Sequence, residues 1–187
     1  GNMYDVVDGT TPTSNFPLRN GKGNNYEGGV RIPLIVRWPG VTQPGSVNHS
    51  VVSTVDHYPA ILEMTGQEPQ PETHKDGVSY VPALKGEAFD RGPTICDKPR
   101  FSFVTMNIPN TSVRHGDWKL YRFWYDRSTS LTAGNPDGQS HRYELYNLKD
   151  DIGENRNLAA ENPEKLLELA DALDAFYEES KALGYNP

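Results

Sequence analysis

The stretch Ile32–Trp38 constrains the fold more than any other part of the chain. It is apolar except for Arg37, contains Pro33, and is closed by the turn dipeptide Pro39–Gly40. A short apolar run of this kind is typical of a strand buried on both faces of a parallel sheet. Such a strand needs neighbours on both edges and a covering layer on each face. We therefore expect an α/β fold in which this strand belongs to a larger sheet.

The second half of the chain predicts a small antiparallel sheet. Residues 111–114 and 118–123 are strand-like segments around a turn at 115–117, which together indicate a hairpin. Residues 143–146 supply a further strand. A subdomain boundary is expected between residues 88 and 100, within a loop system rich in proline and glycine.

Two helices are predicted from start and stop signals. Asp56 is a plausible N-cap for a short helix over residues 57–65. Asn162 at the N-cap and Pro163 at the first helical position begin a longer helix with one apolar stripe, which ends at Gly184. We therefore expect residues 1–95 to be the end of an α/β domain. Residues 96–187 should be the antiparallel sheet with its C-terminal helix.

The charge balance limits the partners of the chain. Its 18 basic and 25 acidic residues give a formal net charge of −7, which argues against a broad surface for nucleic acid or anionic lipid. No apolar stretch approaches the roughly 18 residues that a membrane helix needs. We expect neither a nucleic-acid partner nor a membrane span, so an anionic ligand would need a local basic site.

The most suggestive local cation is Lys22, in an irregular, glycine-rich arm over residues 1–29. Gly21 and Gly23 flank this lysine and leave room for a ligand to approach its ammonium group. Judged on these residues alone, an exposed loop lysine is the commoner situation. A phosphate-binding P-loop is excluded, because Lys22 is not followed by Ser or Thr and Phe16 stands where the motif needs its first glycine.

A family resemblance covers nearly the whole chain. The segment PLRNGKGNNYEGGVRIPLIVRWPG, residues 17–40, resembles the sulfatase pattern G-K-x-x-x-Y-E-G-G-x-R-x-P followed by W-P-G. Residues 55–66 and 76–86 resemble the family's V-D-x-x-P-T-L-L-x-x-x-G helix and D-G-x-S-x-x-P-x-L-x-G loop. Residues 113–120 and 144–158 resemble the hairpin and closing strand of its C-terminal subdomain. The chain is thus similar to the C-terminal portion of formylglycine-dependent sulfatases of the alkaline phosphatase superfamily.

The resemblance implies that Lys22 is a catalytic lysine that binds the sulfate group. Cleavage of a sulfate ester places negative charge on the leaving and equatorial oxygens, and a fixed cation in a dry site stabilises that charge. For Glu27, Gly28, Gly29 and Arg31 we expect a structural role, because a tight glycine turn before the buried strand would position the lysine loop.

Other polar residues give weaker indications. Arg114 and Lys119 flank the hairpin turn and could contact a sulfated sugar, although a solvated strand face explains them equally well. The histidines form no pair at metal-ligand spacing, and we expect His57 to serve packing. Cys96 begins a C-x-x-P-R string whose proline is one place too late for the formylglycine motif C-x-P-x-R, so we interpret it as an ordinary thiol.

The resemblance also implies cofactors. Sulfatases of this family use a formylglycine nucleophile and a calcium ion held by acidic residues, and we expect both to be supplied by residues outside this chain. The isolated chain is therefore expected to be inactive. The lack of other candidate parallel strands leads us to expect the N-terminal part of the same enzyme, or a second copy, beside residues 32–38.

The function predicted from the sequence is hydrolysis of sulfate esters of a sulfated carbohydrate or other small molecule, such as an aryl sulfate. Two alternatives stay open. One is a phosphodiesterase or phosphonate monoester hydrolase on the same scaffold, and the other is a non-catalytic carbohydrate-binding module. The resemblance suggests a periplasmic or extracellular location.

Overall fold

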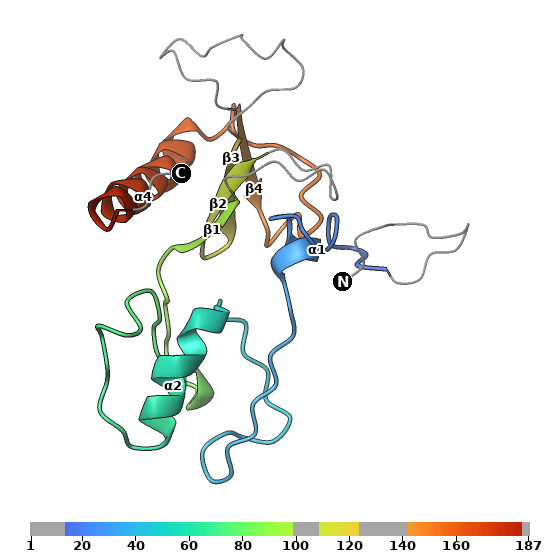
Figure 1. Ribbon diagram of the computed structural model, residues 1–187. Helices are drawn as coiled ribbons and strands as arrows, with labels where there is room; N and C mark the ends of the chain where they lie inside the picture. The colour runs from blue at the N-terminus through green and yellow to red at the C-terminus, as the bar shows by residue number, and fades with distance from the viewer. Residues whose placement is uncertain (1–13, 99–108, 124–141, 185–187) are drawn as a thin grey trace, which may run out of the picture. The chain divides into compact units, whose positions relative to one another are not determined.

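A computed structural model describes residues 14–98, 109–123 and 142–184, which fall into two compact units (Figure 1). One unit combines the chain up to Ile32 with the chain from Ile95 onward, and the other comprises Pro33–Thr94. None of the helices in the described ranges is long and apolar enough to cross a membrane.

The first unit is built on a four-stranded sheet in the order β1-β2-β3-β4. The strands are β1 (Thr94–Lys98), β2 (Asn110–His115), β3 (Trp118–Phe123) and β4 (Arg142–Asn147). β3 pairs antiparallel with both β2 and β4. The predicted antiparallel sheet, with its hairpin and further strand, is therefore confirmed.

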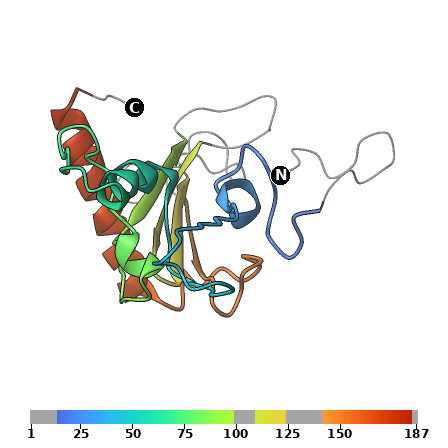
Figure 2. The same cartoon turned by 90° about the horizontal axis from the view of Figure 1, so that it is seen from below.

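One face of this sheet is covered by α4 (Pro163–Ala182), as Figure 2 shows. Leu169 and Leu173 of this helix pack against Leu120 and its neighbours on β2 and β4 to form an apolar cluster. The apolar stripe of α4 provides these contacts because residues three and four apart lie on the same helix face. The predicted C-terminal helix, beginning at Pro163, is confirmed.

The opposite face of the sheet is covered by residues 14–30, which end in the short helix α1 (Glu27–Val30). Tyr26 packs here against Tyr121 and Tyr146. Because side chains alternate between the two faces of a strand, Leu120 faces α4 whereas Tyr121 faces this segment. The described part of the N-terminal arm is thus an integral layer of the first unit.

The second unit contains η1 (Thr54–Asp56), α2 (His57–Met64) and α3 (Val81–Leu84) around a small core of Ala60, Tyr80 and Val81. The fully buried Asp56 accepts the backbone N–H of Ser53 at 2.6 Å and pairs with Arg91 at 2.7 Å. The predicted helix after Asp56 is confirmed. His57 makes a hydrogen bond of 3.1 Å with the Tyr80 hydroxyl, in agreement with a packing role.

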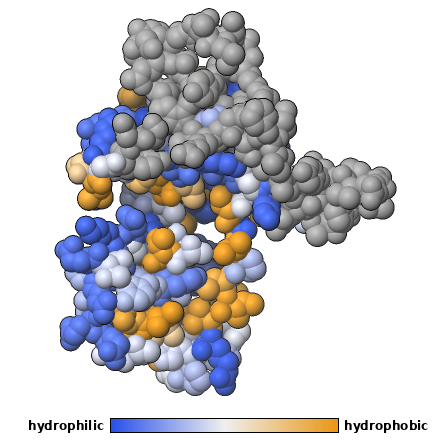
Figure 3. Space-filling model, in the orientation of Figure 1, coloured by the Kyte–Doolittle hydropathy of each residue, from blue (hydrophilic) through white to orange (hydrophobic). Residues whose placement is uncertain are grey.

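The strand expected over residues 32–38 is not formed in the structure, so that prediction is wrong for the described chain. Val36 and Trp38 pack against the small core of the second unit, whereas Ile35 is 91% exposed and Ile32 is 65% exposed. The physical reason is that no described residues pair with the edges of this segment or cover its outer face. Figure 3 shows exposed apolar side chains gathered on the visible face of the second unit.

Candidate functional site

Lys22 lies at the tip of a tight turn formed by residues 21–24. The backbone N–H of Asn24 donates to the carbonyl of Gly21 at 3.1 Å and closes the turn. Gly23 has a φ of 90°, a value that L side chains rarely adopt, and therefore the turn requires glycine there. Lys22 is exposed and makes no hydrogen bond or ion pair with any residue in the described ranges. Its ammonium group is free to meet a ligand.

The chain entering this turn is held by Arg19. Its guanidinium lies 3.9 Å from the centre of the Tyr26 ring. The same group donates to the Tyr146 hydroxyl and to the carbonyl of Glu154, both at 2.9 Å. A cation over an aromatic ring is attracted by the negative face of the ring, and the two hydrogen bonds fix its direction. The N-terminal end of the turn is thereby attached to the sheet.

The chain leaving the turn is held at Asn25. Its carbonyl accepts hydrogen bonds from the Lys119 ammonium at 2.7 Å and from the Tyr121 hydroxyl at 3.1 Å. Its side-chain amide donates to the Asn110 side chain at 2.9 Å and to the Cys96 carbonyl at 3.0 Å. Three strands therefore anchor the C-terminal end of the turn.

Two glycines after the turn allow close backbone packing. A Cβ atom on Gly28 would lie 2.2 Å from the carbonyl oxygen of Asn20, and one on Gly29 would lie 2.1 Å from that of Asn24. Real Cβ contacts are essentially never under 3.0 Å, so neither position accepts a side chain without movement of the backbone. The two glycines let α1 pack directly on the lysine-bearing turn, and these contacts support the expected structural role.

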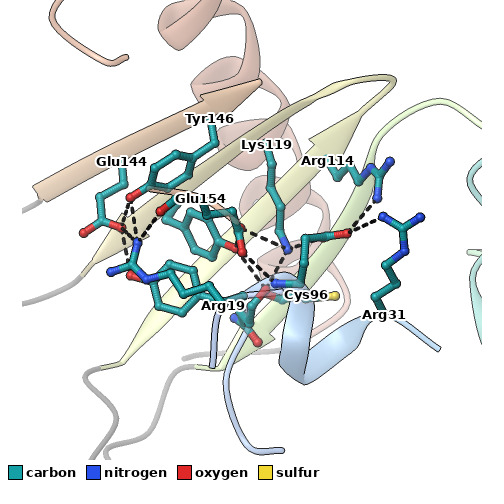
Figure 4. Close-up of polar contacts among 12 residues, drawn as sticks. Arg19, Arg31, Cys96, Arg114, Lys119, Glu144, Tyr146 and Glu154 are labelled. Carbon is teal, nitrogen blue, oxygen red and sulfur yellow. Dashed lines mark hydrogen bonds and ion pairs between the residues drawn. The ribbon is translucent and has the colours of Figure 1, made fainter. Parts of the chain in front are cut away.

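Glu27 is the centre of a buried ionic cluster, which comprises Glu27, Arg31, Arg114, Lys119 and Glu154 (Figure 4). The Glu27 carboxylate is 2.7 Å from the Lys119 ammonium, 3.0 Å from the Arg114 guanidinium and 3.7 Å from the Arg31 guanidinium. Glu27 and Lys119 are only 1% and 2% exposed. Charges so deeply buried need partners, and this cluster provides them.

Glu154 links the cluster to the loop after β4. Its carboxylate accepts the backbone N–H of Glu27 at 2.8 Å and the Tyr121 hydroxyl, and it lies 3.8 Å from the Lys119 ammonium. Burial raises the pKa of Glu154 above its ordinary value, although Lys119 and the Tyr121 hydroxyl favour its charged form. Burial and the nearby carboxylate raise the pKa of Tyr121 as well. Glu154 also has a left-handed φ of 53°, a conformation that costs energy in a non-glycine residue.

The structure assigns different environments to the predicted site residues. Lys22 is exposed, and its contact with sulfate stays a prediction. The Arg114 guanidinium, by contrast, is engaged with Glu27 and with the Gly116 carbonyl at 3.2 Å. Its contact with substrate stays a prediction. The suggestions that Lys119 lies on a solvated strand face or reaches a sugar are wrong, because its ammonium group is buried against Glu27.

Several residues that hold the site were not identified from the sequence, chiefly Arg19, Tyr121 and Glu154. Only Tyr121 carried a weak signal, namely its position on β3 on the face directed away from α4. Their partners lie on distant parts of the chain, and short-range patterns do not reveal such contacts.

The described residues do not fit a metal site. No group of three or more histidine, cysteine, aspartate or glutamate side chains within these ranges could hold a metal ion. The carboxylates nearest the turn, Glu27 and Glu154, are engaged by basic and hydroxyl groups of the chain itself. Cys96 is a half-buried cysteine on β1. The part of the chain that the structure describes therefore offers calcium no cluster of three carboxylates.

Solved structures share this fold. The crystal structure of Ps i-CgsB aligns with 89% of this chain and 33% of its own, with a TM-score of 0.69 and 24% identity. A protein solved in complex with its substrate D-glucosamine-2-N,6-O-disulfate aligns with 79% of this chain and 28% of its own, with a TM-score of 0.61 and 24% identity. In both structures, the fold of this chain corresponds to one part of a longer protein.

Sequence comparison identifies the family. The family described as N-sulphoglucosamine sulphohydrolase, C-terminal, matches residues 21–179, and the chain belongs to this family of sulfatases. A sulfatase of Formosa agariphila is 39% identical over 168 residues, which are 85% of this chain and 28% of the relative. Steryl-sulfatase of Mus musculus is 32% identical over 87% of this chain and 28% of its own length. Arylsulfatase A of Homo sapiens is 33% identical over 81% of this chain and 31% of its own. The chain thus spans less than a third of the length of these relatives, and the resemblance inferred from the motifs is confirmed.

Proposed function

We propose that this chain is the C-terminal part of a sulfuric ester hydrolase and supplies Lys22 as the cation that binds the sulfate group. The observation that carries the proposal is the contrast between Lys22 and the cations around it. Arg19, Arg114 and Lys119 are each engaged by the protein, whereas Lys22 is exposed on a turn that is anchored at both ends.

The proposed role follows from simple electrostatics. A lysine on a mobile loop loses conformational entropy when it binds an anion, whereas a lysine on an anchored turn has already lost part of that freedom. In a site closed to water, its charge would stabilise the sulfate oxygens as negative charge develops on them. The formylglycine and calcium of the family would come from residues outside this chain. Alone, the 187-residue chain should not turn over a sulfate ester.

The substrate class proposed is a sulfated carbohydrate or an aryl sulfate. Its support is the family match, together with relatives named for sulfated substrates, such as steryl-sulfatase and the N-acetylgalactosamine-6-O-sulfatase of Bacteroides thetaiotaomicron. These names differ, and they therefore favour sulfate esters as a class over any single sugar.

The test compares two esters that share a leaving group. The full-length protein that contains this segment should hydrolyse 4-nitrophenyl sulfate with a higher kcat/KM than bis(4-nitrophenyl) phosphate. A preference for the phosphate diester would contradict the proposal and support a phosphodiesterase on the same scaffold. If neither ester is turned over while the isolated chain binds sulfated saccharides, the chain is a binding module instead.

We also propose that the N-terminal part of the enzyme completes the sheet beside residues 32–38. Ile35 and Ile32 are more exposed than apolar side chains of a finished sheet usually are. Hydrogen exchange at the backbone of this segment should be slow in the full-length protein and fast in the isolated chain. Equal exchange in both would contradict this pairing. Light scattering of the isolated chain distinguishes pairing with a second copy, which would double the measured mass.

A further inference from the structure

Lys119 is the most deeply buried cation of the ionic cluster. Its side chain is 3% exposed, and its ammonium group points toward the segment that follows the Lys22 turn (Figure 4). The ammonium group donates two hydrogen bonds of 2.7 Å, one to the Asn25 carbonyl and one to the Glu27 carboxylate.

A buried ion pair is a poor way to stabilise a protein. The loss of hydration of the two charges often cancels their attraction, and an apolar pair of similar size is frequently as stable. A buried pair can instead fix one conformation, because each charged group accepts only a few arrangements of hydrogen-bond partners. The Lys119–Glu27 pair is therefore better suited to fixing a conformation than to raising stability.

The conformation that it fixes is that of the lysine-bearing turn. Asn25 directly follows the turn of residues 21–24, and its carbonyl is held by Lys119. Glu27 begins α1, and Gly29 of this helix packs on the carbonyl groups of Gly21 and Asn24 in the turn. If Lys119 were apolar, the Asn25 carbonyl would lose its charged donor, and the Glu27 carboxylate would be free to turn toward Arg114.

We propose that Lys119 is a positioning residue that holds Lys22 in place through Asn25 and Glu27. This inference rests on the proposed role of Lys22. Lys119 itself does not touch substrate, because its ammonium group is enclosed by the cluster. Its effect on the reaction passes entirely through the position of the turn.

A double-mutant cycle in the full-length protein tests this inference, with 4-nitrophenyl sulfate as substrate. Lys119→Met should lower kcat by about tenfold or more, since a catalytic group misplaced by ~1 Å can cost up to about 10²-fold. In a Lys22→Ala background, the same substitution should change kcat less than about twofold, because the group that it positions is gone.

Glu27→Gln provides a milder variant in case Lys119→Met fails to fold. It keeps the size of the side chain and weakens the ion pair, and its smaller loss of kcat should also vanish in the Lys22→Ala background. The matched control is Arg122→Met. Arg122 lies on the opposite face of the same strand, and its buried guanidinium makes an ion pair of 2.6 Å with the exposed Asp174. This substitution should lower the melting temperature while changing kcat by the same factor in both backgrounds.

The outcomes are separable. Equal losses of kcat with and without Lys22, for both Lys119→Met and Glu27→Gln, would overturn the positioning role and leave a purely structural one. No loss in either background would overturn it as well. A Lys22→Ala enzyme that retains more than half of its kcat would refute the proposed function itself, whatever Lys119→Met does.

Discussion

Substitution of Gly29 by alanine should displace the Lys22 turn directly. No left-handed backbone angle requires glycine at this position, so the effect arises from contact alone. The new Cβ would lie 2.1 Å from the carbonyl oxygen of Asn24 and 2.6 Å from that of Gly21. Gly21 and Asn24 are the first and last residues of the turn that carries Lys22.

The size of the effect follows from these distances. To reach 3.0 Å, the Asn24 carbonyl must move by at least 0.9 Å, the difference between 3.0 and 2.1 Å. A shift of this size at a catalytic group corresponds to a loss of up to about 10²-fold in kcat. Overpacking of a closely packed backbone costs about 1 to 3 kcal/mol. For a protein of this size, that cost lowers Tm by roughly 2 to 12 °C.

The assay measures kcat on 4-nitrophenyl sulfate for the full-length protein, and Tm by circular dichroism for the 187-residue chain to which the estimated shift applies. Gly40→Ala is the matched control, because a Cβ there meets open space and only its φ of 83° is unfavourable. The control should cost about 1 kcal/mol and leave kcat unchanged. A Gly29→Ala enzyme with wild-type kcat and wild-type Tm would refute the close packing of α1 on the turn.

Three further predictions concern the stability of the isolated chain. Arg91→Met should destabilise the second unit by about 3 to 5 kcal/mol, because the carboxylate of Asp56 would stay buried without its cation. Hydrogen exchange at the backbone of α2 measures this loss, and unchanged protection would contradict the prediction. Leu173→Ala should lower the free energy of unfolding in urea by about 2 to 5 kcal/mol, because this side chain is buried. Leu167→Ala, on the exposed side of α4, should lower it by less than about 0.5 kcal/mol. Similar losses for the two variants would contradict the packing of α4. Burial alone raises the pKa of Asp151, but three hydrogen-bond donors from the following loop bring it below its ordinary value. The hydrogen bonds to the charged Asp151 carboxylate stabilise the fold above the unfolded-state pKa of about 3.9, and this contribution is lost as the pH falls through the folded pKa. Asp151→Asn should therefore cost about 1 to 2 kcal/mol at pH 7 and less toward pH 3. A cost independent of pH would contradict this prediction.

The parts of the fold that the sequence predicted are those governed by contacts between near neighbours. The apolar stripe of α4 and its start at Pro163 follow from helical periodicity, and the hairpin follows from alternation around the turn at Gly116. Local rules sufficed for these elements because local geometry decides the outcome. The assignment of Lys22 likewise rests on residues close to it, namely the flanking glycines and a family pattern, and it stays a prediction.

The parts that were missed depend on contacts between distant residues. Glu27 and Lys119 are 92 positions apart, and no pattern within either segment reveals that the two charges meet. The apolar run over residues 32–38 forms no strand in the described chain for a related reason. Its composition indicates burial, but burial depends on neighbours that the described chain does not provide.

The most direct test of the whole account is kcat of the full-length protein after Lys22→Ala, measured on 4-nitrophenyl sulfate beside the exposed-lysine control Lys85→Ala. Loss of one fixed electrostatic stabiliser should lower kcat by roughly 10² to 10³-fold, while Tm stays unchanged and the control keeps full activity. A Lys22→Ala enzyme with more than half of the wild-type kcat would contradict the claim that this chain supplies the sulfate-binding lysine.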